Sequence, residues 1–198
     1  ISGGAPASWA LLAAVVAMAL VGLVNAWLIA YAEIPAMLAT LASAMFITGL
    51  FRYTVLGGGL LILLPKSDPS VAFIGSDLIP GLPVAVALMA LALVATWFLL
   101  DMTAAGRVIY AMGDNFQAAR LTGLPVRPTI IVVYVFAAMT ALLAGLITAA
   151  ASGAVDFRTI TNGTLLFDVI LVVVLGGIPL RGGRGGVRNI IVGVALVA

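Results

Sequence analysis

The stretch WALLAAVVAMALVGLVNAWLIA, residues 9–30, contains no charged side chain. A helix needs about 20 consecutive apolar residues to cross the hydrocarbon core of a bilayer. We therefore predict that this stretch forms a membrane-spanning helix. Small residues recur along one face of it and would let a second helix pack closely. They are Ala10, Ala14, Gly22 and Ala26.

The composition of the whole chain agrees with this prediction. Of its 198 residues, 64% are hydrophobic and 8% are charged, whereas a soluble domain carries about a quarter charged residues. Such a chain cannot cover a surface that faces water, so we predict an all-α, polytopic transmembrane helical bundle. The net charge of +2 is too small to indicate a nucleic-acid partner.

We expect about six membrane segments, separated by polar loops. The segments are residues 9–30, 36–51, 84–100, 129–151, a short apolar helix at 165–175, and a last span that begins near Ile190. The loops are residues 65–83, 101–128, 152–164 and 176–188. Two assignments stay open: 53–64 either extends the second segment or lies at the membrane interface, and 165–175 either spans or re-enters the membrane.

The chain starts at Ile1 and ends in an apolar run. We expect 1–198 to be a single membrane-spanning domain of a longer protein, truncated at both ends. Two loops hold most of the basic residues and should face the cytoplasm, where basic loops of membrane proteins are retained. These residues are Arg107, Arg120, Arg127, Arg181, Arg184 and Arg188. The opposite side would carry Arg52, Lys66 and Arg158.

The sequence GDNFQAARLTG, residues 113–123, is a polar segment within the first of these loops. Asp114, followed three residues later by Gln117, matches a capping box. Gly123 can end a helix, and Pro125 would prevent the helix from restarting. The segment therefore predicts one short helix of about two turns, too short and too polar to cross a bilayer.

This short helix either links two spans or docks into the groove of a partner protein. Its residues on one face are Phe116, Ala119, Arg120 and Gly123. In the docking interpretation, Phe116 is an apolar anchor, while Ala118 and Ala119 allow close approach.

Catalytic and metal sites are not expected. The chain has neither cysteine nor histidine, which excludes thiol nucleophiles, histidine bases and the usual zinc ligands. The glycine-rich segment GGIPLRGGRGG, residues 176–186, lacks the lysine of a phosphate-binding P-loop. We interpret it as a flexible turn at which two helices meet closely, with arginines available to lipid phosphates or to a partner subunit.

Two polar residues in apolar segments are candidates for lining a pathway. Asn25 could line a path or form a hydrogen bond between helices. Asp168 is an ionisable group at membrane depth, which suggests a function, although an aspartate is also favoured at a helix start by the helix dipole.

Four segments, in this order along the chain, resemble one family. They are IPAMLATLASAMFITGLFR (34–52), IGSDLIPGLPVAVALM (74–89), GRVIYAMGDNFQAARLTGLPV (106–126) and FDVILVVVLGGIPLRGGRGG (167–186). The chain resembles the permease subunits of bacterial ATP-binding cassette (ABC) importers of the ribose, xylose and galactose type, in the branched-chain permease superfamily.

The resemblance implies that residues 113–123 are a coupling helix that docks on an ATPase subunit. Its docking residues would be Gly113, Asp114, Asn115, Phe116, Ala118, Ala119, Arg120 and Gly123. The last of the four segments, 167–186, would contain a glycine-rich loop with Gly176, Gly177, Gly182, Gly183 and Gly185.

The resemblance also implies the activity. The chain would move a small polar solute, above all a monosaccharide, across the bacterial inner membrane by alternating access. Its partners would be ATPase subunits, a periplasmic solute-binding protein, a second permease copy and the lipid membrane. The chain itself would bind no cofactor, because the partner uses the ATP. The alternatives are a secondary transporter, which should carry coupling-ion groups at the membrane midplane, and a membrane enzyme, which should carry a clustered catalytic site.

Overall fold

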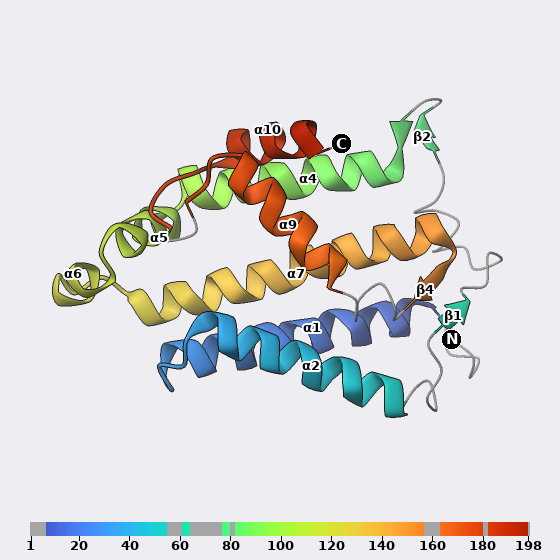
Figure 1. Ribbon diagram of the computed structural model, residues 1–198, viewed down its shortest axis with the longest axis horizontal. Helices are drawn as coiled ribbons and strands as arrows, with labels where there is room; N and C mark the ends of the chain where they lie inside the picture. Colours follow the sequence, from blue (N-terminus) through green and yellow to red (C-terminus); the bar gives the residue numbers. More distant parts are fainter. Residues whose placement is uncertain are drawn as a thin grey trace. The chain divides into compact units, whose positions relative to one another are not determined.

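The computed structural model of the chain describes residues 7–54, 61–63, 77–79, 82–156, 163–179 and 182–197. The helices (Figure 1) are α1 (Ala7–Ala30), α2 (Ala36–Thr54), α4 (Val84–Trp97), α5 (Ala104–Asp114), α6 (Phe116–Leu121), α7 (Val126–Ser152), α9 (Thr164–Leu175) and α10 (Val187–Val197). A π-helical turn, η1 (Phe98–Met102), continues α4. The strands are β1 (Leu61–Leu63), β2 (Asp77–Ile79), β3 (Leu82–Pro83) and β4 (Ala154–Asp156).

Within the described part of the chain, four helical stretches are long and apolar enough to span a membrane. They are Trp9–Ala30, Ala36–Thr54, Val84–Met102 and Val126–Ser152. Two shorter apolar helices follow, Leu165–Leu175 and Val187–Val197. The prediction of an all-α, multi-pass membrane protein is confirmed, and the predicted number of about six segments is loosely met.

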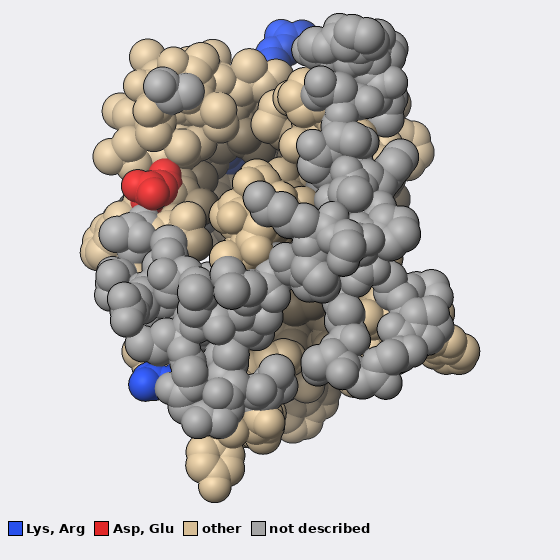
Figure 2. All heavy atoms as spheres, turned by 90° about the vertical axis from the view of Figure 1, so that its right-hand side faces the viewer, with Lys and Arg blue, Asp and Glu red and all other residues tan. Residues whose placement is uncertain are grey.

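The surface is that of a protein solvated by lipid. Many large hydrophobic side chains on the apolar helices are exposed, which is stable where lipid or other apolar surface covers them, because water would penalise the exposed apolar area. Figure 2 shows the charged side chains of the described residues as isolated spots on the face in view.

The chain forms two compact units. They are Ile1–Ala90 with Ile130–Asp156, and Leu91–Thr129 with Phe157–Ala198. In the first unit, α1 contacts α2 and crosses α7 at Gly22. A Cβ atom added at Gly22 would lie 2.9 Å from the carbonyl oxygen of Tyr134 and 3.1 Å from the Cβ atom of Ala138. The small residue predicted to allow close packing of helices does so here, and Ala26 on the same face is fully buried.

The strands of the first unit are short. β1 pairs antiparallel with β4, with Leu61 opposite Asp156, and β2 pairs with β3 in a hairpin. Of residues 53–64, Tyr53 and Thr54 extend α2, whereas Leu61–Leu63 form the strand β1, which the sequence analysis did not predict.

In the second unit, glycines allow close contact between neighbouring elements. α5 packs against η1, where an added Cβ atom at Gly106 would clash with the backbone of Leu100. α9 contacts α10, and the side-chain amide of Asn189 donates a hydrogen bond of 2.7 Å to the carbonyl oxygen of Gly176. Gly176 and Gly193 are buried at this contact.

Several predicted boundaries shift. The third span continues through η1 to Met102, α7 begins at Val126 rather than Thr129, and α10 begins at Val187 rather than Ile190. The prediction also omitted α5, which is an amphipathic helix with Val108 buried and Arg107 exposed. Lys66, Arg158 and Arg181 lie outside the described residues, as do large parts of 65–83 and 152–164.

Candidate functional site

Asn115 separates the helices α5 and α6 (Figure 1) and completes both. Its backbone N–H donates to the carbonyl oxygen of Ala111 at 3.2 Å, in the last turn of α5. Its backbone is extended, with φ −155° and ψ 100°, and its side-chain oxygen accepts a hydrogen bond of 3.0 Å from the N–H of Ala118. Asn115 is therefore the N-cap of α6.

The predicted capping box of Asp114 and Gln117 is wrong by one residue. Asp114 is the last residue of α5, so it cannot also adopt the extended backbone that an N-cap requires. Asparagine caps a helix about as well as aspartate, which allows the neighbouring Asn115 to take this position.

Gly123 follows the end of α6, as predicted, in the left-handed conformation with φ +77°. The N–H of Gly123 donates to the carbonyl of Arg120, and that of Leu124 donates to the carbonyl of Ala119, both at 3.3 Å. This pair of bonds is typical of a Schellman end, which favours glycine at this position.

As predicted, α6 does not restart at Pro125, but a separate helix follows this proline directly. α7 begins at Val126, and the N–H and hydroxyl groups of Thr129 donate to the carbonyl oxygen of Pro125 at 3.2 and 2.8 Å. Proline lacks only an N–H group, and its carbonyl can still accept the first bonds of the helix that follows it.

The side chains of α6 divide into inward and outward residues. Ala119 is only 4% exposed, so it packs within the protein and does not lie on the outer surface. Phe116, Ala118 and Arg120 are exposed. Leu121, which the sequence prediction did not single out, is 87% exposed. The signal in the sequence was a leucine within a polar segment that lies outside the apolar spans.

The segment 113–123 and the glycine-rich loop, which the sequence analysis treated as separate motifs, meet in the second unit. The backbone of Gly113, at the end of α5, lies against the glycine-rich loop at Gly182 and Gly183. A Cβ atom at Gly182 would lie 3.4 Å from the Cα atom of Gly113, and one at Gly183 would lie 2.7 Å from a carboxylate oxygen of Asp114. Both loop glycines are left-handed, with φ +83° and +82°.

A hydrogen bond fixes the same contact. The hydroxyl of Tyr110, on α5, donates to the carbonyl oxygen of Gly185 at 2.7 Å. Burial, and to a smaller extent the negative charge of Asp101, raise the pKa of Tyr110 above its ordinary value, so the hydroxyl keeps its proton and remains a donor.

Two further glycines adopt the backbone conformations that the loop between α9 and α10 requires. Gly177 and Gly185 have φ of +74° and +124°, which glycine adopts without steric strain. A Cβ atom at Gly185 would lie 3.0 Å from the side chain of Ile178. The predicted turn that brings two helices close together is present in this loop.

The two pathway candidates lie in different units. Asn25 is 8% exposed on α1, and its side-chain oxygen has no hydrogen-bond partner in the described part of the chain. Asp168 is exposed and lies in the second turn of α9, beyond the first turn where a helix dipole acts most strongly.

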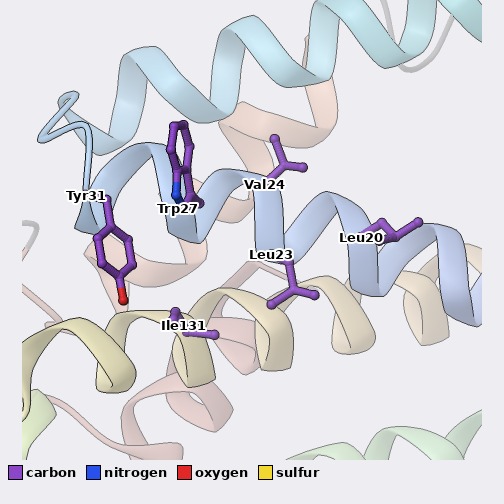
Figure 3. Close-up of a pocket in the computed structure, with 6 residues that line it drawn as sticks. All are labelled: Leu20, Leu23, Val24, Trp27, Tyr31 and Ile131. Carbon is purple, nitrogen blue, oxygen red and sulfur yellow. The ribbon is translucent and has the colours of Figure 1, made fainter.

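An apolar groove of about 300 Å³ lies along α1 in the first unit. Figure 3 shows its lining, which is Leu20, Leu23, Val24, Trp27, Tyr31 and Ile131. Its surface is apolar, so it offers a polar solute little to compensate for lost hydration.

Known proteins with similar sequences include three bacterial permeases. The ribose import permease protein RbsC of Escherichia coli (strain K12) is 31% identical over 191 residues, which cover 95% of this chain and 59% of the relative. The L-arabinose transport system permease protein AraH of the same strain is 33% identical over 174 residues, covering 88% and 51%. The autoinducer 2 import system permease protein LsrC of Klebsiella pneumoniae subsp. pneumoniae is 39% identical over 173 residues, covering 84% and 47%.

The chain thus spans about half the length of the curated relatives it matches. No solved structure matches it. The family described as "Branched-chain amino acid transport system / permease component" matches residues 2–198, almost the whole chain. The resemblance noted in the sequence is confirmed, and the chain belongs to this family of transport-system permease components.

Proposed function

We propose that this chain is part of a permease subunit of an ABC importer in the bacterial inner membrane. It passes a small polar solute, above all a monosaccharide, by alternating access. The family match supports this proposal, as do the names of relatives that import ribose, L-arabinose and autoinducer 2. The permease performs no bond chemistry, because a partner ATPase subunit binds and hydrolyses the ATP.

The exposed side chain of Leu121 is the observation that carries the docking part of this proposal. It is 87% exposed, and Phe116, at the other end of α6, is 44% exposed. Both lie between two spans, in a loop that carries Arg107, Arg120 and Arg127, so they face the cytoplasm rather than lipid. Large apolar side chains exposed to water commonly mark a protein-interaction site, and here the partner is the ATPase subunit.

The contacts of α5 supply a route from the docking helix to the membrane helices. Only Asn115 lies between α6 and α5. α5 contacts the glycine-rich loop at Gly113 and through the Tyr110 hydrogen bond, and that loop leads into α10, which packs on α9. A movement of α6 driven by the ATPase would therefore reach α9 and α10.

The remaining partners complete the importer. A periplasmic solute-binding protein delivers solute on the opposite side of the membrane, and a second permease copy occupies the second site of the ATPase dimer. Asn25 and Asp168 are the candidate pathway residues. A secondary transporter is less well supported, because the charged residues of the four described spans, Arg52, Asp101 and Arg127, lie near span ends rather than at the midplane.

The proposal is tested by co-purification of the full-length parent protein with its ATPase subunit. Leu121→Glu should abolish the complex, because a charge would have to be buried in an apolar contact. Tyr53→Glu is the matched control, since Tyr53 is equally exposed, at 85%, at the end of α2. If the Leu121→Glu protein is folded and retains the ATPase as the control does, the docking assignment is wrong.

A further inference from the structure

A polar pocket of about 370 Å³ lies in the second unit, apart from the exposed face of α6. Three segments line it: Trp97 and Asp101 from α4 and η1, Tyr110 from α5, and residues 185–189 from the glycine-rich loop and the start of α10. Its volume is within the range of pockets that hold small molecules or molecular groups.

The pocket contains one side chain of each charge. Asp101 and Arg188 both line it and are both exposed. Among the described residues, neither side chain takes part in an ion pair or a hydrogen bond. A carboxylate and a guanidinium that share a pocket without neutralising each other suit a ligand that itself carries both charges.

Residues that line the pocket lie near the ends of apolar helices, where the surface of a membrane is expected. Trp97 and Asp101 are near the end of the apolar span Val84–Met102, and Arg188 is in the first turn of the apolar helix Val187–Val197. Tryptophan is enriched at this level of membrane proteins, where its ring sits among lipid headgroups. The ligand of such a pocket can therefore be a component of the membrane.

Beyond the pocket, apolar side chains are exposed on both helices that border it. Leu91 and Val94 on α4, and Ile191 and Val192 on α10, are all exposed. These side chains offer acyl chains a place to lie while a headgroup occupies the pocket.

We propose that this pocket binds the headgroup of a zwitterionic phospholipid that carries a primary ammonium group, as in phosphatidylethanolamine. Arg188 binds the phosphate, and Asp101 accepts hydrogen bonds from the ammonium group. A quaternary ammonium, as in phosphatidylcholine, has no N–H to donate and should bind more weakly. The inference requires only that the chain lies in a membrane, so it is independent of the solute and of the ATPase.

Native mass spectrometry of the delipidated full-length parent protein tests this proposal. Phosphatidylethanolamine, phosphatidylcholine and phosphatidylglycerol with identical acyl chains are added in equal amounts. We expect phosphatidylethanolamine to be retained about fivefold more than either of the others, which corresponds to one modest ion pair. Equal retention of the three lipids, or a preference for phosphatidylglycerol, overturns the proposal.

Substitutions show whether Arg188 and Asp101 cause the preference for phosphatidylethanolamine. Arg188→Gln and Asp101→Asn should each remove it, whereas Arg188→Lys should keep most of it because the positive charge remains. Arg107→Gln is the control, since Arg107 is an exposed arginine of α5 that does not line the pocket. A preference that survives both pocket variants, or that Arg107→Gln removes as well, overturns the assignment.

A competition experiment separates a lipid from a soluble ligand. Free phosphoethanolamine carries the same charged groups without acyl chains. At the concentration of the lipid it should displace little phosphatidylethanolamine, because the apolar surface beside the pocket contributes to binding. Full displacement at that concentration overturns the lipid assignment.

Discussion

The hydroxyl of Tyr110 donates a hydrogen bond of 2.7 Å to the carbonyl oxygen of Gly185, across 75 positions of the sequence. This bond joins the helix that precedes the proposed docking segment to the loop that precedes α10. Together with the crossing of Gly113 and Gly183, it makes α5 and the glycine-rich loop one structural element of the second unit.

Tyr110→Phe should loosen this element without unfolding the protein. Loss of the donor leaves the Gly185 carbonyl without this partner and should cost about 1 kcal/mol. Hydrogen exchange of residues 182–186 should become faster, while Tyr53→Phe, which changes an exposed tyrosine of α2, should leave it unchanged. Equal exchange in both variants would show that the bond does not hold the loop.

Gly113→Ala should destabilise the protein, because the added methyl group would clash with the backbone of Gly183. We expect a loss of about 1–3 kcal/mol, measured as a lower Tm in detergent. Gly145→Ala is the control, since Gly145 lies in α7 with open space around its added Cβ atom. That change should be neutral or stabilising by up to about 1 kcal/mol, and a similar fall in Tm for both variants would contradict the proposed crossing.

Asn115→Ala should weaken α6 by about 1 kcal/mol, the usual value of an N-cap, whereas Asn115→Asp should preserve it. Gln117→Ala should have little effect, because Asn115 rather than Asp114 caps the helix. Hydrogen exchange of the N–H of Ala118 reports this difference. Faster exchange in Gln117→Ala than in Asn115→Ala would instead support a capping box formed by Asp114 and Gln117.

The ionisation of Tyr110 gives a pH-dependent prediction. Burial and the charge of Asp101 raise its pKa above its ordinary value, so its stabilising bond is fully present below about pH 10 and is lost as pH rises through the raised pKa. Asp101→Asn should lower this pKa but leave it above the ordinary value, because burial is the larger cause. The phenolate absorbance, taken as a difference from Tyr110→Phe, measures it, and an unchanged or higher pKa would contradict the prediction.

Gly22→Ala tests the packing of α1 on α7 in the first unit. Its added Cβ atom would lie 2.9 Å from the Tyr134 carbonyl oxygen and from the Cα atom of Val135, so the helices must separate. We expect a loss of about 1–3 kcal/mol in a thermal unfolding assay. Gly49→Ala, in open space on α2, should show no comparable loss, and equal Tm values for the two variants would exclude the close approach.

The sequence predicted the long elements well, because length and apolar composition determine a membrane span almost alone. The start of the second span at Ala36 and that of the third at Val84 are as predicted. Gly123 was predicted as a helix end because its role is local and depends on a positive φ.

The remaining features depend on contacts between distant residues. α5 was missed because the sequence analysis assigned residues 101–128 to a polar loop, although Gly106 and Val108 within it are buried. The contact of Gly113 with Gly183 cannot be predicted from either segment alone. It requires α5 and the glycine-rich loop, which are far apart in the sequence, to approach each other in the fold. The burial of Ala119 likewise depends on how α6 packs, and it leaves Leu121 rather than Ala119 on the outer surface.

The most direct test of the account is a site-specific cross-link at position 121. The 198 residues contain no cysteine, so Leu121→Cys introduces the only thiol of this region, and Tyr53→Cys provides an equally exposed control. In membranes that contain the full-length parent and its ATPase, a thiol-reactive cross-linker should join the ATPase to position 121 and not to position 53. A folded Leu121→Cys protein that gives no cross-link to the ATPase, or no more than the control, would contradict the central claim.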